Sequence, residues 1–312
     1  IRMLIITLLA ILLSACQINS AKHLANTHRN YNQAVTYALN QEILSRRNAS
    51  GKILKDEIDK IGGKSNLLTK PFSIIENIVA CLELHIEQGK VLEQKNIDIG
   101  IVRSIPSISR FSVEVNGQAG HSGTILMDQR ADALVTSSEI ITFVNKLASR
   151  LAKESNQHFV STIGKINVHP NAAAIIPGKV EMTIDLRASS KSSRDQYIKE
   201  LEKQIETMNQ SGPCKIKMKN IAFAPYVEMD KELVKLFKIS SDEYGFSNII
   251  MDSGAGHDTA HLSRVAPASM IFVPCMDGLS HCPEEYAEIS DISKGTSVLF
   301  KMVEKLASLN KN

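Results

Sequence analysis

Residues 81–89 constrain the fold more than any other stretch, because apolar and polar side chains alternate along them. In an extended strand, alternate side chains point to opposite faces of the sheet, so this stretch predicts one apolar and one polar face. Gly89 ends the strand at the edge where α/β sheets bind ligands. A histidine beside carboxylates is a candidate metal ligand, and an edge strand with a solvated polar face is the alternative. The apolar residues are Leu82, Leu84 and Ile86, and the polar residues are Glu83, His85 and Glu87.

The composition is that of a globular protein with room for two domains. Of 312 residues, 43% are hydrophobic and 22% are charged, and the net charge is +3. Tryptophan is absent and aromatic residues make up only 5%, so the chain offers neither a basic stripe nor a stacking platform for bases. We therefore expect no nucleic acid partner.

The first sixteen residues have the pattern of a bacterial signal peptide. Residues 3–15 are almost wholly apolar, follow Arg2, and are too short to span a bilayer comfortably. Residues 13–16 read Leu-Ser-Ala-Cys, which resembles a lipobox and predicts a lipid on Cys16. The expected location is periplasmic or membrane-anchored if this signal is real, and cytoplasmic otherwise. A buried apolar helix is the alternative.

The periodicity of the remaining residues predicts an α/β chain in which one domain is inserted into another. Residues 107–223 have the order strand, helix, two strands, helix, strand, which is typical of a ferredoxin-like unit. Residues 17–106 and 224–312 flank that unit and form the other domain. The expected strands are 81–86, 98–105, 111–115, 160–168, 179–186, 215–223, 249–251 and 270–273. The expected helices are 52–61, 91–94, one capped by Asp128, one beginning at Ser193, one capped by Asp230, and 289–309.

Several polar clusters fall at predicted strand ends and loops. Taken singly, His121 also fits a turn and Arg187 a surface cation. His257 and His261 have the spacing of half a helical zinc site but lack a glutamate between them. Cys282 is a poor nucleophile candidate, since the adjacent His281 points away from it in an extended segment. The clusters are His85 with Gln88, His121, Asn171 with Arg187, residues 253–258 and residues 280–285.

Six motifs occur together and in order, from about Leu44 to the C-terminus. They resemble the amidase, hydantoinase and carbamoylase branch of the M20 metallopeptidase-like family, which includes N-carbamoyl-L-amino-acid hydrolases, allantoate amidohydrolases and β-ureidopropionases. A related aminopeptidase fits less well, because the form Leu-His-Ile-Glu-Gln-Gly is typical of the amidase branch. The motifs are residues 84–89, 120–123 with 127–130, 170–171 through 176–178, 185–187, 254–258 and 280–285.

The resemblance implies an M20-type catalytic domain, here incomplete, with an inserted dimerisation or lid domain. It also implies two zinc or manganese ions per subunit and hydrolysis of a non-peptide C–N bond in an N-carbamoyl or ureido carboxylate. By resemblance, His85 and His281 are metal ligands. His121 reaches into the cleft of the partner subunit in a homodimer, where it binds substrate and polarises the scissile carbonyl. The implied substrate-binding residues are Gln88, Asn171 and Arg187 for the carboxylate, with His257 lining the cleft beside Asp258.

The chain departs from the family pattern upstream of His85. The family places a His-x-Asp segment and a Glu-Glu pair there, and neither occurs upstream of His85 in this sequence, where His23 and His28 are the upstream histidines. A catalytic zinc normally takes three protein ligands, so two imidazoles cannot hold two metals. We therefore expect a truncated or decayed member with weak metal binding and negligible hydrolysis. The alternative is a non-catalytic, lipid-anchored remnant that dimerises or binds small carboxylates.

Overall fold

The stretch that ends at Gly89 forms β1 (Cys81–Ile86), the first strand in a sheet of order β1-β11-β2-β10. The computed structural model describes residues 44–48, 50–68, 78–264 and 266–309. β1 runs parallel to β11 (Ala268–Val273), whose six residues are all buried. β2 (Ile99–Ile105) lies antiparallel to β11 and parallel to β10 (Asn248–Asp252), and β9 (Val227–Glu228) also pairs with β2. We call this the first sheet.

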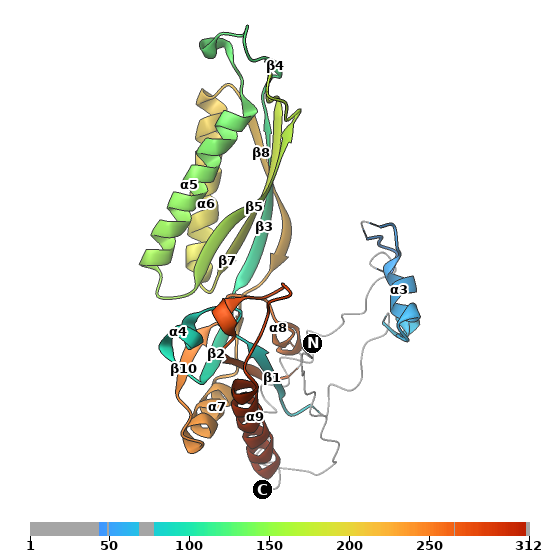
Figure 1. Cartoon of the computed structure of the whole chain (residues 1–312), viewed down its shortest axis with the longest axis vertical. Coiled ribbons are helices and arrows are strands. Elements are labelled where there is room, and N and C mark those ends of the chain that lie inside the picture. Colours follow the sequence, from blue (N-terminus) through green and yellow to red (C-terminus); the bar gives the residue numbers. More distant parts are fainter. Residues whose placement is uncertain (1–43, 49, 69–77, 265, 310–312) are drawn as a thin grey trace.

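Helices cover the first sheet and form its core with it. α7 (Lys231–Glu243) and α9 (Ile289–Leu309) pack together below the sheet in Figure 1. Phe237 of α7 and Ile99 of β2 are fully buried in this core. As predicted, α7 begins after Asp230, whose carboxylate accepts hydrogen bonds from the backbone amides of Glu232 and Leu233. The shorter helices are α3 (Leu54–Lys60), α4 (Val91–Lys95), α8 (Thr259–Leu262), and the 3-10 turns η2 (Ser65–Leu67) and η5 (Met276–Gly278).

β1 is at the edge of the described sheet, but the alternative prediction of a solvated polar face is wrong for the glutamates of residues 81–89. Only 2% of Glu83 and 8% of Glu87 are exposed. The two oxygens of Glu87 accept hydrogen bonds from the backbone amides of Val91 and Leu92, at 2.9 and 2.8 Å. Glu87 therefore satisfies the first turn of α4, whose amides have no partner within the helix.

Residues 107–224 form a second sheet with its own helices, which we call the second unit. Its elements follow the predicted order, and the strand order β5-β7-β3-β8 is antiparallel throughout. Both helices pack on one face (Figure 1). The elements are β3 (Ser107–Asn116), α5 (Ala133–Glu154), β5 (Phe159–His169), β7 (Lys179–Ala188), α6 (Lys191–Ser211) and β8 (Lys215–Ala224).

The long helix α5 begins later than predicted. Asp132, not Asp128, caps it by accepting hydrogen bonds from the amides of Leu134 and Val135. Asp128 lies in the 3-10 turn η4 (Met127–Gln129), and Arg130 beside it is extended, with its guanidinium donating to the carbonyls of Ser122 and Ile125. The helix therefore cannot start before Asp132.

The first turn of α5 turns two apolar side chains outward: Leu134 and Val135 are 39% and 57% exposed. α6 begins at Lys191 and is capped by Ser190, two residues before the predicted start at Ser193. The apolar residues that α5 buries are Ala133, Ile140, Val144, Leu147, Ala148 and Leu151.

The chain passes between the two sheets at two adjacent points. β2 ends at Ile105 and β3 begins at Ser107; β8 ends at Ala224 and β9 returns to the first sheet at Val227. At the far end of the second unit, β4 (Gly120–His121) pairs with β6 (Ile175–Ile176), well away from β1 in Figure 1. The limits of the inserted domain at residues 107 and 223 remain a prediction made from the sequence.

The predicted signal peptide and Cys16 lie outside the described residues. Among the residues that the structure describes, no helix combines the length and apolar character needed to cross a bilayer.

Candidate metal and substrate site

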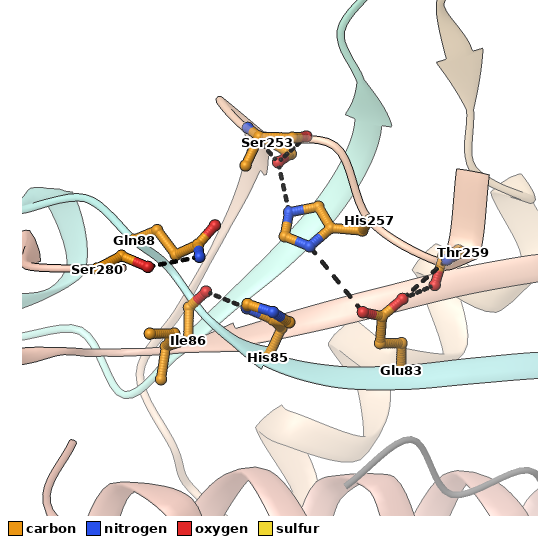
Figure 2. Close-up of polar contacts among 9 residues, drawn as sticks. Glu83, His85, Ile86, Gln88, Ser253, His257, Thr259 and Ser280 are labelled. Carbon is orange, nitrogen blue, oxygen red and sulfur yellow. Dashed lines mark hydrogen bonds and ion pairs between the residues drawn. The ribbon is translucent and has the colours of Figure 1, made fainter. Parts of the chain in front are cut away.

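His85 lies near the end of β1 with its tautomer fixed by the backbone. Its Nδ1 is 2.8 Å from the carbonyl oxygen of Ile86, which can only accept, so Nδ1 carries the proton. The other ring nitrogen, Nε2, therefore keeps its lone pair. This is the usual arrangement of a metal-ligating histidine. Figure 2 shows the ring between the Ile86 carbonyl and the pair formed by Glu83 and His257.

Glu83, His85 and His257 form one group, which we call the Glu83 cluster. Each residue offers a ligand atom, and these atoms lie within 4.8 Å of one another. The His85 and His257 rings meet edge to face, with centroids 4.7 Å apart. Burial, together with the neighbouring His85 ring, lowers the pKa of His257 to about 3, so His257 is neutral. Two neutral imidazoles and a carboxylate are a set of ligands that zinc accepts.

The loop after β10 holds His257 in place. Nε2 of His257 is 2.9 Å from Oγ of Ser253, and Ser253 Oγ also lies 3.0 Å from both the nitrogen and the oxygen of Ala255. On the other side, one oxygen of Glu83 accepts hydrogen bonds from both the backbone amide and the hydroxyl of Thr259. Nδ1 of His257 faces the second oxygen of Glu83 at 3.9 Å (Figure 2).

Gln88 connects the end of β1 to the segment that carries His281. Its side-chain amide donates to Oγ of Ser280 at 2.7 Å, and Ser280 donates in turn to Glu285 at 2.7 Å. The Glu285 carboxylate also accepts from the backbone amide of His281 at 3.0 Å. The Ser280 hydrogen bond is the main cause that lowers the pKa of Glu285; burial opposes it, and the His281 and His85 rings add to the lowering. Gln88, Ser280 and Glu285 therefore form one chain of hydrogen bonds that ends at the backbone amide of His281.

Arg187 brings the second unit into contact with this loop. Its Nη1 donates to the carbonyl of Gly254 at 2.9 Å, and its Nε donates to Asp185 at the same distance. The guanidinium is 30% exposed, so part of it is open to solvent. Arg187 is thus not the free surface cation that its sequence position alone allowed.

His121 and Asn171 lie elsewhere. His121 is in β4, where its Nδ1 accepts a hydrogen bond from the amide of Gly123 at 3.0 Å. Asn171 is exposed in the turn that leads to β6. Because β4 pairs with β6 at the end of the second unit remote from β1, one chain does not bring these two side chains to His85 (Figure 1).

Sequence reasoning placed Glu83 on the polar face of β1 and gave it no role in the site. The available signal was its position two residues before His85, which puts both side chains on the same face of the strand. What the sequence did not show was the contact with Thr259, 176 residues away. His261, the other half of the considered helical zinc pair, is exposed and does not belong to the Glu83 cluster.

Comparison with known proteins gives relatives of one kind. The chain is 34% identical over 283 residues to an N-carbamoyl-L-amino-acid amidohydrolase of Pseudomonas sp. (strain NS671), covering 85% of this chain and 67% of that protein. It is also 34% identical to the allantoate amidohydrolase of Bacillus subtilis (strain 168), covering 86% and 63%.

A solved structure agrees with these relatives. The amidase of the hydantoinase/carbamoylase family from Burkholderia multivorans superposes with a TM-score of 0.74 at 30% identity, over 86% of this chain and 63% of that one. The chain therefore spans about two thirds of the length of the relatives it matches. The mixed α/β fold and the predicted family agree with these findings, and residues 25–305 match the model of peptidase family M20/M25/M40, to which this chain belongs.

Proposed function

We propose that this chain belongs to a metal-dependent amidohydrolase that cleaves the C–N bond of a small ureido carboxylate, such as an N-carbamoyl amino acid or allantoate. The observation that carries the proposal is the fixed tautomer of His85, which leaves Nε2 available as a ligand in the group formed with Glu83 and His257. The relatives named for these substrates support the substrate class.

The proposed ligands of the metal are His85 and His281, with zinc or manganese as the ion. The ligand chemistry fits, since His85 keeps one nitrogen free and the exposed His281 follows Ser280, which accepts a hydrogen bond from Gln88 just beyond β1. A bound divalent ion lowers the pKa of water and stabilises the oxyanion of an acyl intermediate. The residues of this chain then have the tasks of binding and orienting the substrate.

Arg187 is proposed to bind the substrate carboxylate, together with Gln88 and Asn171. The planar guanidinium suits a carboxylate, and part of it is exposed beside the loop that carries His257. Gln88 already points to the same segment as His281 through Ser280. His257 is proposed to line the cleft.

A homodimer is proposed because His121 and Asn171 are remote from β1 within one chain. In a dimer formed through the second unit, the β4 end of one subunit supplies His121 to the partner's site, where its ring polarises the scissile carbonyl. Two strongly exposed apolar residues near β4 support a partner surface there: Leu126 is 63% and Met127 is 78% exposed. We expect Leu126→Ser combined with Met127→Ser to shift the mass measured by light scattering to that of a monomer, whereas Ile289→Ser, at 79% exposure on α9, leaves it unchanged.

The 312-residue chain alone is proposed to be impaired, because it lacks the His-x-Asp and Glu-Glu segments that the family resemblance implies upstream of His85. The test is ammonia release from an N-carbamoyl-L-amino acid and from allantoate in the presence of Zn²⁺ or Mn²⁺, with calorimetry on the same substrates. Binding without turnover supports both the substrate class and the impairment. Turnover contradicts the impairment alone, and the absence of both binding and turnover contradicts the proposed function.

Arg187 offers a matched pair of variants for that experiment. Arg187→Ala should abolish substrate binding. Arg110→Ala should not, although Arg110 donates to the same Asp185 carboxylate at 2.8 Å. Equal binding by the two variants would contradict the role given to Arg187.

A further inference from the structure

The Glu83 cluster contains a pair of groups that no hydrogen bond joins. Nδ1 of His257 faces an oxygen of Glu83 at 3.9 Å, and both side chains are almost fully buried, at 2% and 3% exposure. That separation is beyond the range of a hydrogen bond. A buried carboxylate oxygen that faces a ring nitrogen across such a gap needs a partner of its own.

The hydrogen bonds around Ser253 decide which nitrogen of His257 carries the proton. Ser253 has one hydroxyl proton, and its Oγ lies near an amide, a carbonyl and Nε2 of His257. All three contacts are satisfied only if Ser253 donates to the Ala255 carbonyl and accepts from both the Ala255 amide and His257 Nε2. Nδ1 of His257 then keeps its lone pair and points it at the Glu83 oxygen, where one acceptor faces another.

The same reasoning applies to the other two members of the cluster. Nδ1 of His85 is committed to the Ile86 carbonyl, so its lone pair is on Nε2. One oxygen of Glu83 is committed to Thr259, which leaves the other for a ligand. Each of the three residues thus has one electron-pair donor that is unused and one group that is anchored by the protein, which is how metal ligands are oriented.

We propose that Glu83, His85 and His257 together bind one divalent transition-metal ion, through one Glu83 oxygen, His85 Nε2 and His257 Nδ1. Ligand atoms on a tetrahedral zinc are about 3.4 Å apart, so the gap between Glu83 and His257 closes by about 0.5 Å on binding. This set shares His85 with the proposed pair His85 and His281 and adds two ligands, one from β1 and one from the loop after β10. We therefore expect one cation at the Glu83 cluster.

This inference deepens the proposed function but is tested without turnover, so failure of ureido carboxylate hydrolysis leaves it standing. The full chain is titrated with Zn²⁺ and with Co²⁺, whose visible absorption reports the coordination geometry. We expect saturation at one equivalent and the intense absorption of a four-coordinate cobalt ion. No saturable binding, or two equivalents, would overturn the proposal.

Variants distinguish this site from the family arrangement. Glu83→Gln keeps an acceptor for Thr259 but removes the charge. Glu83→Gln and His257→Gln should each weaken Zn²⁺ binding by more than the roughly 10- to 100-fold that is lost when a residue that only orients a ligand is removed. His261→Ala is the matched control, because His261 is an exposed histidine on α8 just after the loop. A loss of Zn²⁺ binding in His261→Ala as large as that in His257→Gln would overturn the proposal.

A measurement on the unsubstituted chain covers the case in which a buried variant does not fold. X-ray absorption at the zinc edge counts imidazoles by their multiple scattering. The proposal requires two imidazoles per zinc, from His85 and His257, in a first shell made only of nitrogen and oxygen. One imidazole or none would contradict it.

Discussion

At the scale of single residues, the alternating polar side chains of β1 and of the residue that follows it have different tasks. Glu87 accepts two backbone amides of α4, whereas Glu83 holds Thr259 and faces His257. His85 lies between them with one nitrogen committed to the backbone. The same residue type, two positions from the same histidine, is structural on one side and part of the candidate site on the other.

Removing the Glu87 carboxylate should destabilise the fold. Glu87→Ala leaves the amides of Val91 and Leu92 without their partner, and hydrogen bonds to a charged group are worth about 1.5–3 kcal/mol each. We expect the free energy of unfolding in urea to fall by about 2–3 kcal/mol. Glu139→Ala, on the exposed face of α5, is the control and should change it by less than about 0.5 kcal/mol. Equal effects would show that Glu87 does not hold α4.

At the scale of elements, the accuracy of the sequence prediction depends on whether the deciding interaction is local. The closing helix 289–309 and the cap Asp230 follow from periodicity and from a hydrogen bond between residues two or three apart, and both are observed. The predicted start of α5 was wrong because Asp128 and Asp132 are residues of the same type and are equally good caps in sequence. The structure chooses Asp132 through the contacts of Arg130 with a preceding loop.

The role of Glu83 could not be read from the sequence for the same reason. Its partners His257 and Thr259 come from the loop after β10 and from the start of α8, which follow the second unit in the chain. The family resemblance proposed His85, Gln88 and His257 as site residues, and the fold supplied the contacts that group His85 and His257 with Glu83.

The two candidate caps of α5 can be compared directly. Asp132→Ala should lower the free energy of unfolding by about 1 kcal/mol, because the amides of Leu134 and Val135 lose their acceptor. Asp128→Ala should have almost no effect, since Asp128 is exposed in a 3-10 turn that precedes the helix. Thermal and urea denaturation measure the stability of both variants. A larger loss in Asp128→Ala would contradict the assigned helix start.

At the scale of the whole molecule, a few polar contacts join the second unit to the first sheet. Asp252 at the end of β10 accepts two hydrogen bonds from Arg103, one from Ser104 and one from the backbone amide of His158, which precedes β5. Arg187 adds the bond to the Gly254 carbonyl. Asp252 therefore binds both units.

The stability contributed by Asp252 should depend on pH. Burial raises the pKa of this carboxyl, but the hydrogen bonds from Arg103, Ser104 and His158 together lower it by more than burial raises it. The net shift of the pKa is therefore downward. A depressed pKa means that the contribution is fully present above the unfolded value of about 3.9 and is lost as the pH falls through the folded value. Asp252→Asn should thus be less stable than the unsubstituted chain at neutral pH, and the difference should vanish in acid.

Urea denaturation at a series of pH values measures this difference. Asp195→Asn is the control, because Asp195 is exposed and pairs only with its neighbour Arg194 in a contact of little stability. A constant difference between Asp252→Asn and the unsubstituted chain across the acid range would contradict an ionic role for Asp252.

The bond from Arg187 to Gly254 mechanically links the two halves of the molecule. Gly254 lies three residues before His257, in the loop whose other end is fixed to Glu83 through Thr259. If the second unit rotates about the crossings at residues 105–107 and 224–227, either the hydrogen bond from Arg187 to the Gly254 carbonyl breaks or the loop moves with the second unit. A carboxylate ligand that draws Arg187 away from Gly254 would consequently release the segment that orients His257. Binding of the ligand at Arg187 would then make the position of His257 less restrained.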